Sequence, residues 1–275
     1  MSTATIGFIG GGNMAASIIG GLLTSGVDAR QLRAGDPSQE SLDRLASLGP
    51  ITTSQDNLDI IPGCDVLVMA VKPQLMKVVC AGIADTVQAS KPLIISIAAG
   101  VTSDSLNHWL GGNLAIVRCM PNTPALLRCG ATGLFANTAV SEIQRQQAQQ
   151  ILDAVGLALW VEQESELDAV TAVSGSGPAY FFLMMEAMQA SGEALGLSPD
   201  VAKQLSQQTA LGAARMALES DVDVAELRRR VTSPKGTTER AITIFEDGGF
   251  RALVQQALQG AADRADELGR ELEGE

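Results

Sequence analysis

Through residue 161 the chain alternates short apolar runs with segments whose apolar residues recur at helical spacing. Short apolar runs bounded by turn residues indicate strands buried on both faces of a parallel sheet, and the segments between them indicate helices. The expected strands are residues 5–9, 31–35, 65–71, 92–97, 113–119 and 157–161. This alternation predicts an α/β, Rossmann-type doubly wound sheet over residues 1–162.

After residue 162 the strand-like runs stop, and the pattern becomes helical. The helices expected here are residues 179–195, 199–219, 224–231, 238–245 and 251–273. Ser198 before Pro199 is a good helix start. The polar, acidic stretch 162–166 is the expected hinge. The sequence therefore predicts an all-α C-terminal domain over residues 163–275.

The expected helix 179–195 is apolar on most of its surface, with Phe181, Phe182, Met185 and Met188 on different faces. Such a helix is either central to its own domain or shared with a second subunit. We favour the second interpretation, because the apolar surface exceeds what one small core needs. The all-α domain is therefore expected to form a homodimer.

Glycines follow the first expected strand directly, in the segment IGFIGGGNMAASIIGG at residues 6–21. Gly10 can take the tight turn after the strand, and Gly12 lets the backbone approach a phosphate because it has no Cβ. The helix that begins next would direct its free N–H groups at the anion. This order of strand, glycines and helix predicts dinucleotide binding.

Three further strand ends should border the same cleft, because ligands bind outside the carboxyl ends of parallel strands. Gly35 and Asp36 end the second strand, where a Rossmann fold presents its ribose-binding residue. The other two ends are the segments 70–73 and 96–100. Lys72 would suit a diphosphate electrostatically, although Pro73 could simply end the strand.

Three polar loops remain open to more than one interpretation. Residues 120–124 and 174–178 are stiff or glycine-rich, which fits either a ligand-facing loop or a structural turn. Residues 232–239 are rich in hydroxyl groups and enter a helix. Such a loop can bind a small carboxylate or can be an ordinary N-cap.

Composition narrows the classes of function. The formal charge of −12 over 275 residues disfavours a nucleic-acid partner. The longest apolar run is too short to cross a bilayer, and the N-terminus has no basic segment before an apolar stretch. We therefore expect a cytoplasmic protein. The four cysteines lack metal-site spacing and His108 is the single histidine, so no metal site is expected.

The motifs GFIGGGNMA, AVKP, SIAAG, MPNTP, AVSGSGPAY and VTSPKGTTERAI, in this order, resemble the pyrroline-5-carboxylate reductase family. The resemblance implies reduction of (S)-1-pyrroline-5-carboxylate to L-proline, the last step of proline biosynthesis. It implies NADPH as cofactor, with NADH possible because Asp36 favours a free ribose. It also implies a homodimer, often in a larger ring of dimers such as a homodecamer.

The same resemblance implies the site residues. Thr238 matches the family's candidate proton donor. The residues implied to bind substrate are Glu164, Ser233, Gly236, Thr237 and Thr238. Those implied to bind the cofactor are Gly10, Gly12, Asn13, Met14, Gly35, Asp36, Asn57, Ala70, Val71, Lys72, Pro73, Ala98 and Ala99.

Two other functions are less compatible with the sequence. A β-hydroxyacid dehydrogenase needs a lysine on the helix after the Rossmann domain, but no lysine lies between Lys91 and Lys203. A dinucleotide-sensing regulator would need a surface for DNA or a partner, and the acidic charge disfavours DNA.

Overall fold

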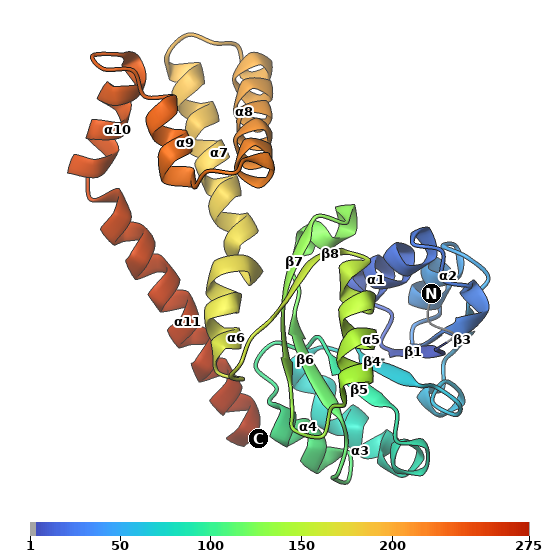
Figure 1. The fold of residues 1–275 in the computed structure, drawn as a ribbon. Coiled ribbons are helices and arrows are strands. Elements are labelled where there is room, and N and C mark those ends of the chain that lie inside the picture. The colour runs from blue at the N-terminus through green and yellow to red at the C-terminus, as the bar shows by residue number, and fades with distance from the viewer. Residues whose placement is uncertain (1–3, 275) are drawn as a thin grey trace. The chain divides into compact units, whose positions relative to one another are not determined.

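The computed structural model describes residues 4–274 and divides into two compact units (Figure 1). The first unit holds the residues up to 176 and those from 260 onward, and the second holds residues 177–259.

The first unit is built on one sheet, which has eight strands among the described residues, in the order β3-β2-β1-β4-β5-β6-β7-β8. The order reverses between β1 and β4, which is the switch point of a doubly wound sheet. The strands are β1 (Ile6–Ile9), β2 (Leu32–Gly35), β3 (Thr52–Ser54), β4 (Val66–Met69), β5 (Leu93–Ser96), β6 (Ile116–Met120), β7 (Gly130–Ala136) and β8 (Gly156–Trp160). The predicted Rossmann-type fold is confirmed.

Helices cover both faces of this sheet. The α-helices of the unit are α1 (Asn13–Thr24), α2 (Gln39–Ala46), α3 (Pro73–Ser90), α4 (Ser103–Trp109), α5 (Glu142–Asp153) and α6 (Glu166–Val170). Short 3-10 turns are η1 (Ala29–Gln31), η2 (Asn57–Asp59) and η3 (Thr123–Leu127). Adjacent strand residues point to opposite faces, so Phe8 belongs to one apolar core and Ile9 to the other.

β7 differs from the all-parallel pattern, because it pairs antiparallel with β6 and parallel with β8. The apolar-run criterion did not predict β7, since Gly130 and Gly133 interrupt its sequence. These glycines are needed for close packing: a Cβ on Gly133 would lie 2.7 Å from Val170. Small residues therefore weaken the sequence signal while serving the packing.

The compact units do not coincide with the domain boundary expected after residue 162. Leu167 in α6 and Ala172 in the following π-helical turn η4 (Thr171–Gly175) are both buried in the first unit. Near the C-terminus, Leu272 packs against the core that contains Ile9. The chain thus leaves the first unit later than the hinge-like composition of residues 162–166 suggests, and then returns to it.

The second unit is helical and has little core of its own. It contains α7 (Gly177–Ala194), α8 (Pro199–Glu219), α9 (Val224–Arg230), α10 (Thr237–Asp247) and the first turns of α11 (Phe250–Gly274). Ser198 caps α8 by accepting the N–H of Val201, as its position predicts. None of the described helices is long and apolar enough to cross a bilayer.

Large apolar side chains of this unit are exposed. On α7, Phe181 is 68% exposed and Phe182 is 63% exposed. Ile244 and Phe245 on α10 and Leu211 and Met216 on α8 are also exposed. A soluble monomer rarely leaves so many large apolar groups open in one small unit, so this surface is suited to a second protein chain.

Candidate functional site

The turn between β1 and α1 lies at the switch point of the sheet. Gly10 has a φ of +100°, and a Cβ there would come within 2.6 Å of the carbonyl oxygen of Ala70. Its N–H donates to the carbonyl oxygen of Gly35 over 2.7 Å. The end of β1 is thus fixed between the ends of β2 and β4, and only glycine fits there.

Gly12 precedes α1 as its N-cap and leaves the helix start open. No side chain caps α1, and a Cβ built on Gly12 would meet no atom within 4 Å. Free space therefore lies beside the first helical residues, Asn13 and Met14. A side chain at position 12 would fill the cradle that a diphosphate needs at a helix N-terminus.

Asp36 follows β2, but its carboxylate serves the glycine turn. Oδ2 accepts the backbone N–H of Gly11 over 2.6 Å, and Oδ1 accepts the N–H of Ser38 over 2.8 Å. The guanidinium of Arg44 donates to the carbonyl oxygen of Gly11 over 2.7 Å. One carboxylate and one cation therefore hold the two sides of Gly11. The sequence analysis did not single out Arg44.

Asn57 and Gly35 lie against each other beside this turn. A Cβ on Gly35 would lie 2.6 Å from Oδ1 of Asn57. Among the described residues, that buried oxygen has no hydrogen-bond partner. A buried amide oxygen without a donor is costly, so Asn57 is suited to accept a hydrogen bond from a bound nucleotide.

The segment after β4 carries Ala70, Val71, Lys72 and Pro73 to the same edge of the sheet. The N–H of Ala70 donates to the carbonyl oxygen of Ile9 over 2.7 Å, which places this segment beside the glycine turn. Lys72 is exposed and is the N-cap of α3, and Pro73 is its first residue. Pro73 therefore starts a helix, where its missing N–H costs nothing.

The loop after β5 carries Ala98 and Ala99. Ala98 is buried, and its N–H donates to the hydroxyl of Ser96 over 3.3 Å, whereas Ala99 is exposed. Gly100 follows with a φ of +77°. The loop leads into α4, whose first residue is Ser103.

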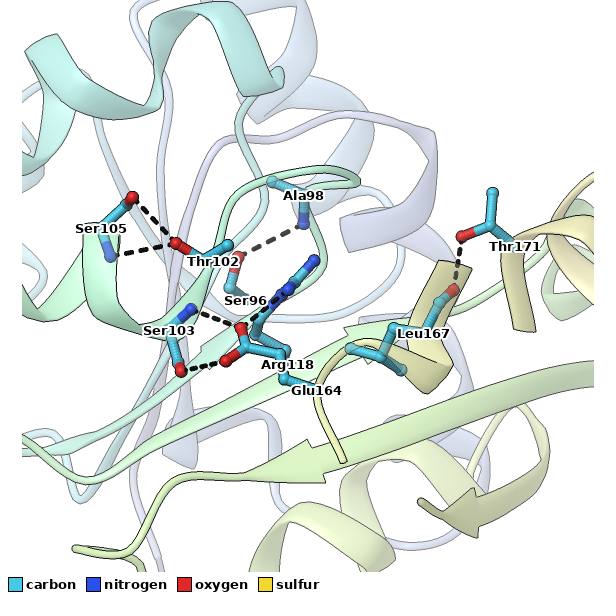
Figure 2. A network of polar contacts seen from close by, with 9 residues as sticks. All are labelled: Ser96, Ala98, Thr102, Ser103, Ser105, Arg118, Glu164, Leu167 and Thr171. Atoms are coloured by element: carbon cyan, nitrogen blue, oxygen red, sulfur yellow. Dashed lines mark hydrogen bonds and ion pairs between the residues drawn. The ribbon is translucent and has the colours of Figure 1, made fainter. Parts of the chain in front are cut away.

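Glu164 lies in a polar network with Ser103, which follows this loop, and with Arg118 (Figure 2). Its Oε1 accepts the N–H of Ser103 over 2.6 Å and the guanidinium of Arg118 over 2.7 Å. Its Oε2 accepts the hydroxyl of Ser103, also over 2.6 Å. Both oxygens are engaged within the chain, so the structure gives Glu164 a different set of partners from the substrate contact expected for it.

Arg118 and Ser103 were not predicted from the sequence. Arg118 lies in β6 and is only 8% exposed. The available signal was an arginine inside an apolar strand, because a buried charge requires a partner of opposite sign. Only the tertiary structure identifies that partner, because Glu164 is far from Arg118 in the sequence.

A polar cavity of about 310 Å³ adjoins this network in the first unit. Its lining includes Gly100, Thr102, Asp168, Asp266 and Arg270. Burial raises the pKa of Asp168, Arg118 opposes that shift, and Asp266 and Glu164 reinforce it.

The loop after β6 proves to be internally bonded. Asn122 is buried, its Nδ2 donates to the carbonyl oxygen of Ser174 over 2.9 Å, and its Oδ1 accepts the N–H of Ala131 over 2.9 Å. Both ends of the amide are thus used to join η3, β7 and η4. The structural interpretation of residues 120–124 accounts for Asn122.

In the second unit, the loop that enters α10 carries the residues expected to bind substrate: Ser233, Gly236, Thr237 and Thr238. The N–H of Gly236 donates to the carbonyl oxygen of Ser233 over 3.0 Å, which closes a tight turn. The turn therefore uses the N–H donor of Gly236 within the chain.

The next N–H groups of this loop remain suited to an anion. No side chain caps α10, and Thr237 and Thr238 are exposed. Within the described chain, their backbone N–H groups meet no acceptor. The carboxylate of Glu239 accepts the N–H of Lys235 over 2.7 Å and so steadies the loop. The start of α10 thus carries open donors and hydroxyl groups.

Across residues 4–274, no group of three His, Cys, Asp or Glu side chains could hold a metal ion. Burial raises the pKa of Cys64 and raises that of Cys80 to about 12, which disfavours the thiolate form of both. Arg229 and Arg230 pair with Glu226 at the end of α9.

The doubly wound sheet, the open glycine turn and the buried Asn57 oxygen define a dinucleotide-binding oxidoreductase fold. Residues 5–100 match the family model described as NADP oxidoreductase coenzyme F420-dependent. Residues 164–268 match the model described as pyrroline-5-carboxylate reductase dimerisation.

The chain is 57% identical to pyrroline-5-carboxylate reductase of Pseudomonas aeruginosa over 272 residues, covering 99% of both chains. It is 44% identical to the Haemophilus influenzae enzyme of the same name, covering 98% of each. A solved pyrroline-5-carboxylate reductase from Coxiella burnetii superposes with a TM-score of 0.94 at 48% identity, covering 97% of this chain and 99% of that one. The chain belongs to the pyrroline-5-carboxylate reductase family.

A more distant solved relative supports the fold at the cofactor end. Pyrroline carboxylate reductase of Plasmodium falciparum, described with NADP bound, has a TM-score of 0.85 at 28% identity, covering 98% of this chain and 99% of that one. A 3-hydroxyisobutyrate dehydrogenase of Mycobacterium tuberculosis has a TM-score of 0.51 at 16% identity, which shows a likeness of fold alone.

Proposed function

We propose that this chain reduces (S)-1-pyrroline-5-carboxylate to L-proline, the last step of proline biosynthesis, with NADPH as its cofactor. The observation that carries the proposal is the family relationship, which extends along nearly the whole chain. When bound, NADPH supplies the hydride that reduces the C=N bond of the substrate.

The first unit holds the cofactor in this proposal. The backbone of Gly12, Asn13 and Met14 binds the diphosphate at the open start of α1, where the helix N–H groups favour an anion. Lys72 adds a positive charge at the adjacent strand end. Gly10, Gly35, Asn57 and the segments 70–73 and 98–99 shape the rest of the cofactor surface.

NADPH is the preferred cofactor in the proposal, although an acidic residue follows β2. In enzymes that select NADH, this residue hydrogen-bonds the ribose hydroxyls. Here both carboxylate oxygens of Asp36 already accept backbone N–H groups, and Arg44 lies on the other side of Gly11. The Asp36 carboxylate therefore supports the turn, and the Arg44 guanidinium can bind the 2′-phosphate of NADPH.

The second unit holds the substrate carboxylate. The N–H groups of Thr237 and Thr238 and the hydroxyl of Ser233 bind it at the start of α10. The Thr238 hydroxyl donates a hydrogen bond to the ring nitrogen and orients the imine. Because a protonated imine is already a good electrophile, the protein has mainly to position the substrate and exclude water.

The proposal also includes assembly and location. Two copies pair through the exposed apolar side chains of α7, α8 and α10, and the dimers form a ring such as a homodecamer. The cytoplasm is the proposed location, which the free thiols of Cys64, Cys80, Cys119 and Cys129 support. Light scattering with size-exclusion chromatography measures the assembly directly.

The decisive experiment follows NADPH and NADH oxidation by absorbance, each with and without pyrroline-5-carboxylate, and identifies the product by chromatography. Steady turnover that yields proline, faster with NADPH, is the expected result. Cofactor binding without turnover would instead indicate a dinucleotide sensor, and turnover with a β-hydroxyacid would indicate a dehydrogenase.

A further inference from the structure

The carboxylate of Glu164 connects three parts of the first unit that are distant in sequence. It joins β6 through Arg118, the first turn of α4 through Ser103, and the segment before α6 to which it belongs (Figure 2). We propose that Glu164 is a positioning residue, which holds the loop 97–102 in place against the nicotinamide half of the cofactor. This inference rests on the proposed function.

The loop 97–102 is held more strongly at its far end than at its start. The hydrogen bonds at its start are long: the N–H of Ile97 donates to the carbonyl oxygen of Met69 in β4 over 3.2 Å, and the N–H of Ala98 donates to the side-chain hydroxyl of Ser96 over 3.3 Å. The two bonds from Ser103 to Glu164 are 2.6 Å each. Hydrogen bonds to an ionised carboxylate are shorter and stronger than neutral ones. The loop is therefore anchored at Ser103.

Arg118 makes Glu164 a fixed anchor. Arg118 is buried in β6. In the register of the sheet it pairs with Ser96 of the neighbouring strand β5. Its guanidinium lies 2.7 Å from Oε1 of Glu164. Arg118 therefore fixes the position of the Glu164 carboxylate. Arg118 itself lies next to Ser96, the end of β5 from which the loop starts. The anchor and the start of the loop share one rigid support.

Glu164 acts through the loop and does not itself bind a ligand. Both of its oxygens are already bonded to Ser103 and Arg118. Ala98 and Ala99 lie between Ser96 and Ser103, so the anchor at Ser103 restrains the loop that carries them. The adenosine half of the cofactor depends on other residues, which surround Gly11 and Asn57. A change at Glu164 should therefore weaken binding of the nicotinamide half of the cofactor and leave binding of the adenosine half unchanged.

The test compares Glu164→Gln with wild type by isothermal titration with NADPH and with adenosine 2′,5′-bisphosphate, which lacks the nicotinamide. Glutamine keeps the shape of the side chain and can still bond to Ser103, and a thermal unfolding curve checks that the variant stays folded without the ion pair to Arg118. The expected result is a dissociation constant for NADPH that rises about fivefold, typical of coupling between sites. The constant for adenosine 2′,5′-bisphosphate should stay unchanged.

Glu166→Gln is the matched control, because the Glu166 carboxylate accepts only the nearby N–H groups of Glu162 and Gln163. It should leave both constants unchanged. Ser103→Ala, which removes only the hydroxyl bond, should reproduce the selective loss in weaker form.

The proposal is overturned if Glu164→Gln weakens both ligands equally, which indicates general loosening, or weakens neither. These titrations contain no pyrroline-5-carboxylate. A wild-type protein that binds NADPH but fails to turn over would therefore refute the proposed function while leaving this comparison intact.

Discussion

The backbone N–H of Gly11 donates to Oδ2 of Asp36 over 2.6 Å, so the acidic residue at the end of β2 holds the glycine turn. Its second oxygen accepts the N–H of Ser38 at the start of α2. A residue type that usually selects a free ribose has here become part of the structure that shapes the phosphate site.

Asp36→Asn should weaken NADPH and NADH to a similar extent and should not reverse the preference between them. The reason is that the amide keeps one acceptor oxygen but loses the charge-assisted bond to Gly11. Titration with each cofactor measures both constants. A selective loss of NADH binding would show that Asp36 contacts the ribose after all.

Arg44→Gln should weaken NADPH more than NADH, because Arg44 is the cation bonded to the carbonyl oxygen of Gly11. The loss for NADPH should be about tenfold, as expected for one charge-assisted hydrogen bond. Arg30→Gln is a suitable control, since Arg30 pairs only with Asp28 in its exposed turn. Equal losses of affinity for both cofactors would mean that Arg44 supports the turn but does not contact the 2′-phosphate of NADPH.

Gly12→Val should abolish cofactor binding while the protein remains folded. The space beside Gly12 is open, so a side chain can be accommodated, but it would then occupy the approach of the diphosphate. Circular dichroism and cofactor titration together check this. Gly82→Ala, on the exposed face of α3, should bind normally. Unchanged binding by the valine variant would refute the phosphate assignment.

Thr238→Ala should lower kcat and leave cofactor affinity nearly unchanged. Loss of a hydrogen bond to the ring nitrogen should cost about 1–3 kcal/mol of transition-state stabilisation. Thr243→Ala on the same helix is the control, because the Thr243 hydroxyl bonds only within α10. Steady-state kinetics with varied substrate distinguish the two variants. Identical kinetics would remove Thr238 from the mechanism.

Asp168→Asn should stabilise the protein near neutral pH. Burial raises the pKa of Asp168 in the folded state above its unfolded value, so its contribution to stability is lost as pH rises through the folded pKa. Asparagine removes that titration. The stability advantage of the variant should shrink as pH falls from neutral toward the raised pKa of Asp168, because protonation removes the buried charge of the wild-type carboxylate. Urea unfolding of both proteins across this range would contradict the prediction if the difference stayed constant.

Local pattern was enough to predict the glycine turn and most of the parallel strands. Residues 6–21 contain strand, turn and helix signals that act within a few residues of one another, and the structure confirms their order. The apolar α7 surface was predicted in the same way, because exposure of Phe181 and Phe182 follows from helical spacing in a small unit. β3 and β7 were missed, since the first is short and polar and the second contains glycines.

The partners of charged groups were beyond the reach of the sequence. Nothing local shows that Asp36 bonds to Gly11, or that Glu164 meets Arg118 and Ser103, because each pair is brought together only when distant segments pack on one sheet. The sequence by itself determined the class of fold, the cofactor loop and the family motifs, which depend on local spacing. Only the tertiary structure decided which groups the carboxylates of Asp36 and Glu164 bond to, because their partners come from segments that are distant in sequence.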